Sequence, residues 1–115
     1  MPQTDFTLPG EAAVVTGAGA GIGREIATRL TESGVNVAIN DLDESALSDT
    51  ADALAGNDGN LITLVGDASD PDVLEAAGIA DATTLLLTVG DDTTAIFTTL
   101  IARELNPDLH IVVRA

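Results

Sequence analysis

The residues best suited to chemistry lie in the glycine-rich segment TGAGAGIGRE, residues 16–25. It follows an apolar run and precedes apolar residues at helical spacing. Glycines let a backbone approach a pyrophosphate closely, and the first N–H groups of the following helix point at the anion. The spacing T-G-x-x-x-G-x-G fits the segment, whereas G-x-G-x-x-G does not fit cleanly. We therefore expect a dinucleotide-phosphate site formed by Gly17, Ala18, Ala20, Gly21, Ile22 and Gly23, the alternative being a glycine-rich turn without a ligand.

Acidic residues follow the second apolar run. Asp41 stands eighteen positions beyond Gly23, where an acid can accept hydrogen bonds from both ribose hydroxyls of an adenosine. We expect Asp41 and its neighbour Leu42 to bind that ribose. An acid there repels a 2′-phosphate, which favours NAD (NADH) over NADP. In the alternative, Asp41 or Asp43 caps the helix that follows.

The elements that position these residues alternate along the chain. Five apolar runs predict strands, and residues at helical spacing between them predict helices. This alternation predicts an α/β fold, a Rossmann-like three-layer αβα sandwich with a five-stranded parallel sheet of order 3-2-1-4-5. We expect one domain over 1–115. The predicted strands are 11–17, 35–40, 61–66, 83–89 and 109–115.

The predicted helix 91–105 is apolar around nearly its whole circumference. Such a helix needs burial on more than one side, which predicts a homodimer formed through it. The GDD triplet at 90–92, at the start of this helix, has two interpretations. Adjacent carboxylates can hold a hard cation, but acids at a helix N-terminus more often cap it.

The charge is strongly negative, because nineteen acids face four arginines and the net charge is −15. Such repulsion is tolerable at molar salt, so we expect a halophilic cytoplasmic protein rather than one with a local acidic interaction surface. Nucleic acid is a poor partner for this charge. Without cysteine and with one histidine, no Cys or multi-His metal site is expected. No signal peptide and no direct membrane insertion are expected, because no apolar stretch is long enough.

Two family resemblances follow from the motifs. Residues 9–45 resemble the N-terminal half of the short-chain dehydrogenase/reductase family, whose typical TGxxxGIG stands here as TGAGAGIG. Residues 64–115 resemble the TrkA-N domain, the N-terminal lobe of regulators of potassium conductance (RCK), through GDAS, TVGDD and ARELNP. The chain therefore looks like a chimera of two Rossmann halves, natural or engineered, with a seam near 45–63.

Both families place an Asp after the third strand beside the adenine. The resemblance assigns this role to Asp67, with the backbone N–H of Ala68 meeting the ring. In the alternative, Asp67 caps a helix that begins near Pro71. The dehydrogenase family uses a tyrosine and a lysine for catalysis, and this sequence contains neither, so we expect no enzyme activity.

The TrkA-N resemblance implies a non-catalytic domain that binds NAD(H), or alternatively ATP or ADP, and controls a potassium channel or transporter. It also implies pairing through surface helices. The family's last helix and strand are missing, so we expect the fifth strand to be an exposed edge. Two alternatives remain: a recombined or designed Rossmann scaffold with no regulatory role, and a truncated short-chain dehydrogenase without its catalytic half.

Overall fold

The computed structural model describes residues 12–88 and 91–114. Five parallel strands form one sheet in the order β3-β2-β1-β4-β5, which confirms the predicted topology. The strands are β1 (Ala12–Thr16), β2 (Asn36–Asp41), β3 (Leu61–Val65), β4 (Thr84–Leu87) and β5 (His110–Val113). The helices are α1 (Gly21–Glu32), α2 (Glu44–Leu54), α3 (Pro71–Ala76), the short 3₁₀ helix η1 (Ile79–Asp81) and α4 (Asp92–Leu105).

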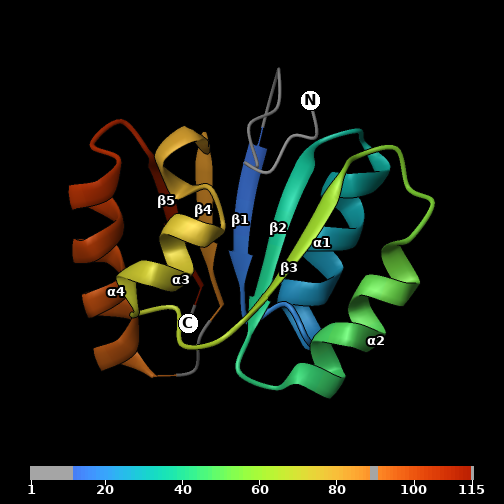
Figure 1. The fold of residues 1–115 in the computed structure, drawn as a ribbon, viewed down its shortest axis with the longest axis horizontal. Coiled ribbons are helices and arrows are strands. Elements are labelled where there is room, and N and C mark those ends of the chain that lie inside the picture. The colour runs from blue at the N-terminus through green and yellow to red at the C-terminus, as the bar shows by residue number, and fades with distance from the viewer. Residues whose placement is uncertain (1–11, 89–90, 115) are drawn as a thin grey trace.

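The helices cover both faces of the sheet, with α1 and α2 on one side and α3 and α4 on the other (Figure 1). Successive strand residues point to opposite faces, so both faces of a covered sheet must be apolar. Val14 belongs to the core beneath α3 and α4, whereas Val15 belongs to the core beneath α1 and α2. This is why the strands read as continuous apolar runs rather than as alternating ones.

Aspartates cap three of the four α-helices. Asp43 accepts a hydrogen bond from the first turn of α2, Asp70 from that of α3, and Asp91 from that of α4. The capping alternative raised for Asp41 or Asp43 is therefore confirmed at Asp43 and wrong for Asp41. The N-cap of α3 is Asp70, so a helix cap at Asp67 is wrong as well. At α1 the N-cap is Ala20, whose side chain makes no capping bond, and the first turn contains no acid.

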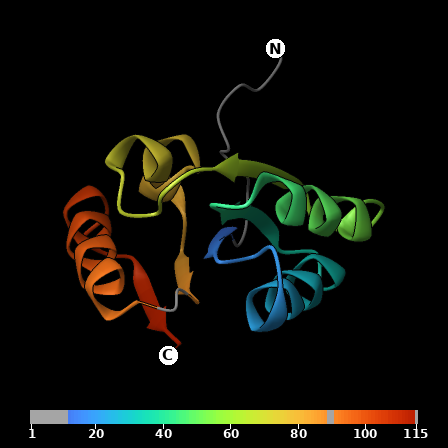
Figure 2. The ribbon, with the colours of Figure 1, turned by 90° about the horizontal axis from the view of Figure 1, so that it is seen from below.

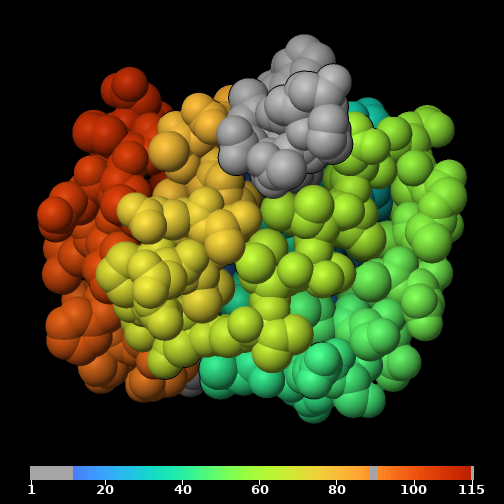
Figure 3. All heavy atoms as spheres, in the orientation of Figure 1, coloured from blue at the N-terminus to red at the C-terminus, as the bar shows by residue number. Residues whose placement is uncertain are grey.

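The two edges of the sheet are less well covered than its centre. Three of the five β3 residues are partly buried and the other two, Thr63 and Val65, are exposed. Figure 3 shows atoms of this segment at the surface between α3 and α2. At the other edge, three of the four β5 residues are exposed. On neighbouring α4, only Thr98 and Ala102 are buried. Its apolar residues Ile96, Phe97 and Leu100 are 55–61% exposed.

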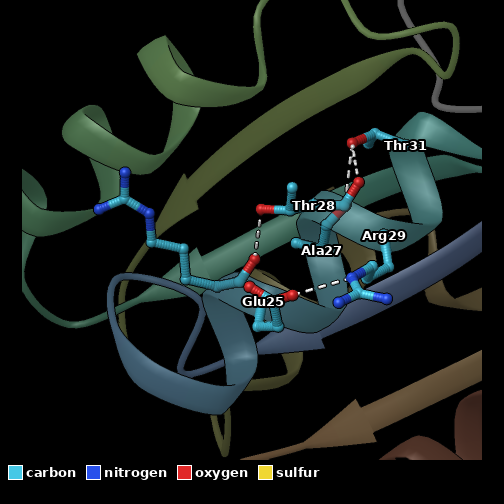
Figure 4. A network of polar contacts seen from close by, with 6 residues as sticks. Glu25, Ala27, Thr28, Arg29 and Thr31 are labelled. Atoms are coloured by element: carbon cyan, nitrogen blue, oxygen red, sulfur yellow. Dashed lines mark hydrogen bonds and ion pairs between the residues drawn. The ribbon is translucent and has the colours of Figure 1, made fainter.

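Salt bridges compensate little of the net negative charge of the protein. The described residues contain one ion pair, between Glu25 and Arg29 at 2.8 Å on neighbouring turns of α1 (Figure 4). Both side chains are mostly exposed, so the pair adds little to stability. Within the described ranges, no helix combines the length and the apolar character needed to cross a bilayer.

Candidate functional site

A cavity of about 320 Å³ opens at the carboxyl ends of the strands. Figure 2 views the molecule from this end, with the sheet between its two helical layers. The volume lies within the range of small-molecule sites, and open α/β sheets bind ligands at this edge. The end of β2, the loops after four strands and the start of α4 form the wall: Gly17, Ala20, Asn40, Asp41, Leu42, Gly66, Asp67, Ala68, Thr88, Asp91 and Thr94.

The Asp41 carboxylate joins two loops at this cavity. Its Oδ2 accepts a hydrogen bond of 2.8 Å from the backbone N–H of Gly19, and its Oδ1 accepts one of 2.9 Å from Asp43. A Cβ atom at Gly19 would lie 2.8 Å from Oδ2, so residue 19 must be glycine for this contact. A carboxylate has about four lone-pair positions. Asp41 therefore retains acceptor capacity for hydroxyl groups in the cavity.

Ala18 anchors the glycine loop to the rest of the protein through hydrogen bonds of its backbone groups. Its N–H donates to the carbonyl of Asn40 at 3.0 Å, and its carbonyl accepts from the buried hydroxyl of Thr50 at 3.0 Å. The side chain is fully buried and does not line the cavity. Both backbone groups of Ala18 are thus hydrogen-bonded within the protein, and its contact with a ligand stays a prediction.

Thr88 packs closely against two of the glycines. A Cβ atom on Gly17 would lie 2.5 Å from Thr88 Oγ1. A Cβ atom on Gly23 would clash first with the backbone carbonyl oxygen of Gly17, and it would also lie 2.7 Å from Thr88 Oγ1. The hydroxyl donates to the carbonyl of Thr16, which ties the end of β4 to the end of β1. Gly23 is thus buried beneath the loop and is not part of the cavity wall, whereas Gly17 is both packed and part of it.

Gly21 differs from these packed glycines. It has a φ of +58°, which favours glycine, yet a Cβ atom there would meet nothing within 4 Å. Gly21 and Ile22 begin α1, and their exposed positions leave the N-terminus of that helix open. Neither residue lines the cavity.

The loop after β3 forms the far wall. Asp67 accepts hydrogen bonds from the backbone N–H of Ser69 at 2.8 Å and from its hydroxyl at 2.7 Å. These two bonds, the backbone one first, hold the pKa of the Asp67 carboxyl below its ordinary value. Buried Asn40 donates to the carbonyls of Leu64 and Gly66, which fixes this loop beside β2.

The start of α4 forms the opposite wall. Asp91 Oδ2 accepts from the Thr94 hydroxyl at 2.7 Å, and the carboxylate also accepts from the N–H groups of Thr93 and Thr94. The Thr94 hydroxyl is the main cause of a lowered pKa at Asp91. The capping interpretation of GDD is therefore confirmed at Asp91, while residue 90 lies outside the described residues.

Five residues of the cavity wall were not predicted to bind a ligand: Asn40, Gly66, Thr88, Asp91 and Thr94. Each directly follows or ends a strand, or begins α4, so position at the carboxyl edge of the sheet was the available signal. Metal binding has no counterpart in the described ranges, where no group of three or more His, Asp or Glu side chains could hold an ion.

Comparison with known proteins shows both resemblances. The chain is 36% identical over 94 residues to Potassium channel protein 1 of Methanocaldococcus jannaschii, a match covering 82% of this chain and 27% of that protein. It is 44% identical over 62 residues to the probable oxidoreductase EphD of Mycobacterium tuberculosis, covering 54% of this chain and 10% of that protein. The chain therefore spans a minor part of the length of each.

Solved structures agree on the fold. The TrkA-N domain of inner membrane protein ybaL from Escherichia coli has a TM-score of 0.76 at 21% identity, over 91% of this chain and 72% of that chain. The Shewanella denitrificans Kef CTD in AMP-bound form has a TM-score of 0.73 at 26% identity, over 91% of this chain and 59% of that one.

The TrkA-N domain family matches residues 13–115. That match includes the glycine loop as well as the segment from residue 64 onward, so one family accounts for both walls of the cavity. A seam near 45–63 stays a prediction. The chain belongs to the TrkA-N domain family.

Proposed function

We propose that this chain is a regulatory domain that binds an adenine nucleotide of the NAD(H) type in the cavity at the carboxyl edge of its sheet. The order of groups along the cavity wall carries the proposal. Gly17 and Ala20 come after β1, Asp41 is the last residue of β2, and Asp67 comes after β3. Along the sheet this order matches pyrophosphate, ribose and adenine, in a single direction.

The open N-terminus of α1 supplies the phosphate position. The first N–H groups of a helix lack intrahelical acceptors and carry its positive dipole end. Ala20 cannot cap them, and no acid in the first turn competes for them. Gly21 presents no side chain in front of them. A pyrophosphate at this point receives several N–H groups at once.

The Asp41 carboxylate, Leu42 and Ala68 form the rest of the proposed site, where the ribose and the adenine bind. The backbone N–H groups of Gly19 and Asp43 hold the Asp41 carboxylate, which accepts hydrogen bonds from the ribose hydroxyls with its remaining lone pairs. A 2′-phosphate placed there meets this carboxylate, so NAD is bound in preference to NADP. Leu42, which is 74% exposed at the cavity wall, covers the adenosine, and Ala68 contacts the adenine ring.

The proposed role is binding rather than catalysis. The sequence has no tyrosine, lysine or cysteine. Acid–base catalysis at neutral pH needs a group whose pKa lies near 7. The two carboxyls at the cavity with resolved shifts, Asp67 and Asp91, both have pKa values lowered from 3.8, which moves them away from that range.

The relatives support a partner in potassium transport. One matching protein is named a potassium channel, and a structural neighbour is the Kef CTD bound to AMP. The bound nucleotide of this domain would control a potassium channel or transporter. We expect the domain to act as a homodimer through α4, whose exposed Ile96 and Leu100 border an open apolar hollow of about 380 Å³ that extends to Val113 on β5.

Calorimetric titration in molar KCl tests the nucleotide assignment. NAD, NADH, NADP, ADP and ATP are each titrated into the protein. The proposal expects saturable binding with NAD or NADH tighter than NADP. Tighter binding of NADP would overturn the assignment of Asp41, and no binding of any adenine nucleotide would leave the scaffold alternative in place.

A further inference from the structure

The charges on the cavity wall are all of one sign. Asp41, Asp67 and Asp91 line it, and no arginine or histidine is among the lining residues of the described chain. Hydrogen bonds from Ser69 and Thr94 hold the pKa values of Asp67 and Asp91 below 3.8, so both are ionised at neutral pH. The charged side chains on this wall therefore repel a polyanionic ligand, and Arg24, in the first turn of α1, is not among the lining residues.

Only one helix N-terminus at the cavity remains available to an anion. The start of α1 is uncapped, whereas Asp91 caps α4 with hydrogen bonds to Thr93 and Thr94. Because α4 begins at the same cavity, its capping carboxylate replaces a second anion-binding position with a negative charge. The cavity thus has one favourable place for phosphate and one unfavourable place.

The position of Asp91 determines which part of a ligand it meets. In the strand order β3-β2-β1-β4, Asp67 lies beyond β3 and Asp91 beyond β4, at opposite ends of the row. Neighbouring strands are about 4.8 Å apart, so three steps separate these ends by about 14 Å. With the adenine at Asp67 and the pyrophosphate over β1, the group beyond the pyrophosphate approaches Asp91.

We propose that Asp91 makes this cavity select adenine nucleotides by the charge of the group beyond the pyrophosphate, favouring the cationic nicotinamide ring of NAD⁺ over the neutral ring of NADH and disfavouring the terminal phosphate of ATP. This inference rests on the proposed function, because it assumes that the adenosine lies at Asp41 and Asp67. Asp91 acts as a specificity-determining residue that leaves the adenosine contacts unchanged.

The test compares ligands that differ only at that end. Calorimetry measures the affinities of NAD⁺ and NADH, and of ADP and ATP, for the parent protein and for Asp91→Asn. Asparagine is an equally good N-cap, so this change removes the charge while keeping the cap of α4. Asp108→Asn is the matched control, since it changes the net charge equally in the exposed loop at the other end of α4.

The parent is expected to bind NAD⁺ about three- to tenfold tighter than NADH, and ADP tighter than ATP by a similar factor, with smaller ratios in molar KCl because screening weakens surface electrostatics. In Asp91→Asn both ratios fall towards one, whereas Asp108→Asn keeps them. Equal affinities in the parent, or unchanged ratios in Asp91→Asn, would overturn this inference while leaving nucleotide binding intact. Failure of all four ligands to bind would overturn the proposed function and this inference with it.

Discussion

The backbone N–H of Gly19 donates a hydrogen bond of 2.8 Å to Oδ2 of Asp41. This bond joins the glycine loop after β1 to the end of β2. In the proposed function, the residue that binds the ribose therefore also holds the loop that receives the phosphates. Binding at one position depends on the geometry of the other, and substitutions of Asp41 should affect both.

Replacing Asp41 with alanine removes a charge-assisted hydrogen-bond pair to the ribose, which corresponds to roughly 1.5–3 kcal/mol. We expect the NAD affinity to fall about tenfold to hundredfold. NADP should lose less or gain, because its 2′-phosphate no longer meets a carboxylate. Calorimetry measures both affinities, and hydrogen exchange should show faster exchange of the Gly19 amide.

Asp43→Asn is the control for this variant. Asp43 neighbours the site but caps α2 through the N–H of Ala46, and asparagine preserves such a cap. The control should bind NAD like the parent. Equal binding of NAD and NADP by the parent, with both unaffected in Asp41→Ala, would place the ribose elsewhere.

Gly21→Ala tests the phosphate position separately from the packing of the loop. Its positive φ makes alanine cost about 1–2 kcal/mol of stability, although the new methyl group meets no protein atom. Gly34 is a matched position at the other end of α1, with a φ of +86° and equally open surroundings. Thermal melts should show similar losses for Gly21→Ala and Gly34→Ala.

Nucleotide binding should separate the two glycine variants. The methyl group at residue 21 stands before the open N-terminus of α1, so Gly21→Ala should bind NAD more weakly than Gly34→Ala does. Identical NAD affinities for the two variants in calorimetry would show that no phosphate lies over Gly21.

Stability should rise steeply from dilute buffer to molar KCl. A net charge of −15 on 115 residues repels itself, and the Debye length falls from about 10 Å at 0.1 M to about 3 Å at 1 M salt. Salt also weakens attractive ion pairs, but this loss of stability is small because the one ion pair of the described residues is exposed. Thermal melts across a KCl series measure the effect, and NaCl at equal ionic strength should reproduce it. A flat melting temperature would remove the halophile hypothesis.

Assembly through α4 is tested by Ile96→Glu. Ile96 is 60% exposed on the apolar side of α4, so a glutamate there should convert a dimer into monomers without disturbing the core. Val65→Glu is the control, because Val65 is 50% exposed on β3 at the opposite edge of the sheet. Light scattering reads the mass of each. A parent that is already monomeric would contradict the homodimer prediction.

The sequence by itself determined the elements and their order. Alternating apolar runs and helical spacing predict five strands and four helices, because strand and helix periodicities depend on neighbouring residues alone. The strand order followed from the handedness of crossovers, which is general to parallel sheets. The bounds of the apolar runs placed Asp41 and Asp67 just beyond predicted strands, and both residues line the cavity.

The contacts between distant segments were decided only by the tertiary structure. Thr16 of β1 pairs with Leu87 of the neighbouring strand β4 and with Asn40 of the neighbouring strand β2. The residues that follow these three, Gly17, Thr88 and Asp41, therefore lie in one row across the sheet. Nothing local to Thr88 indicates that it fills the space left by glycines more than sixty positions earlier. The capping role of an aspartate depends likewise on where its helix begins, which is why Asp43 rather than Asp41 caps α2. Register and helix start are fixed by packing across the whole sheet, and that packing turned a glycine-rich motif into a cavity with defined walls.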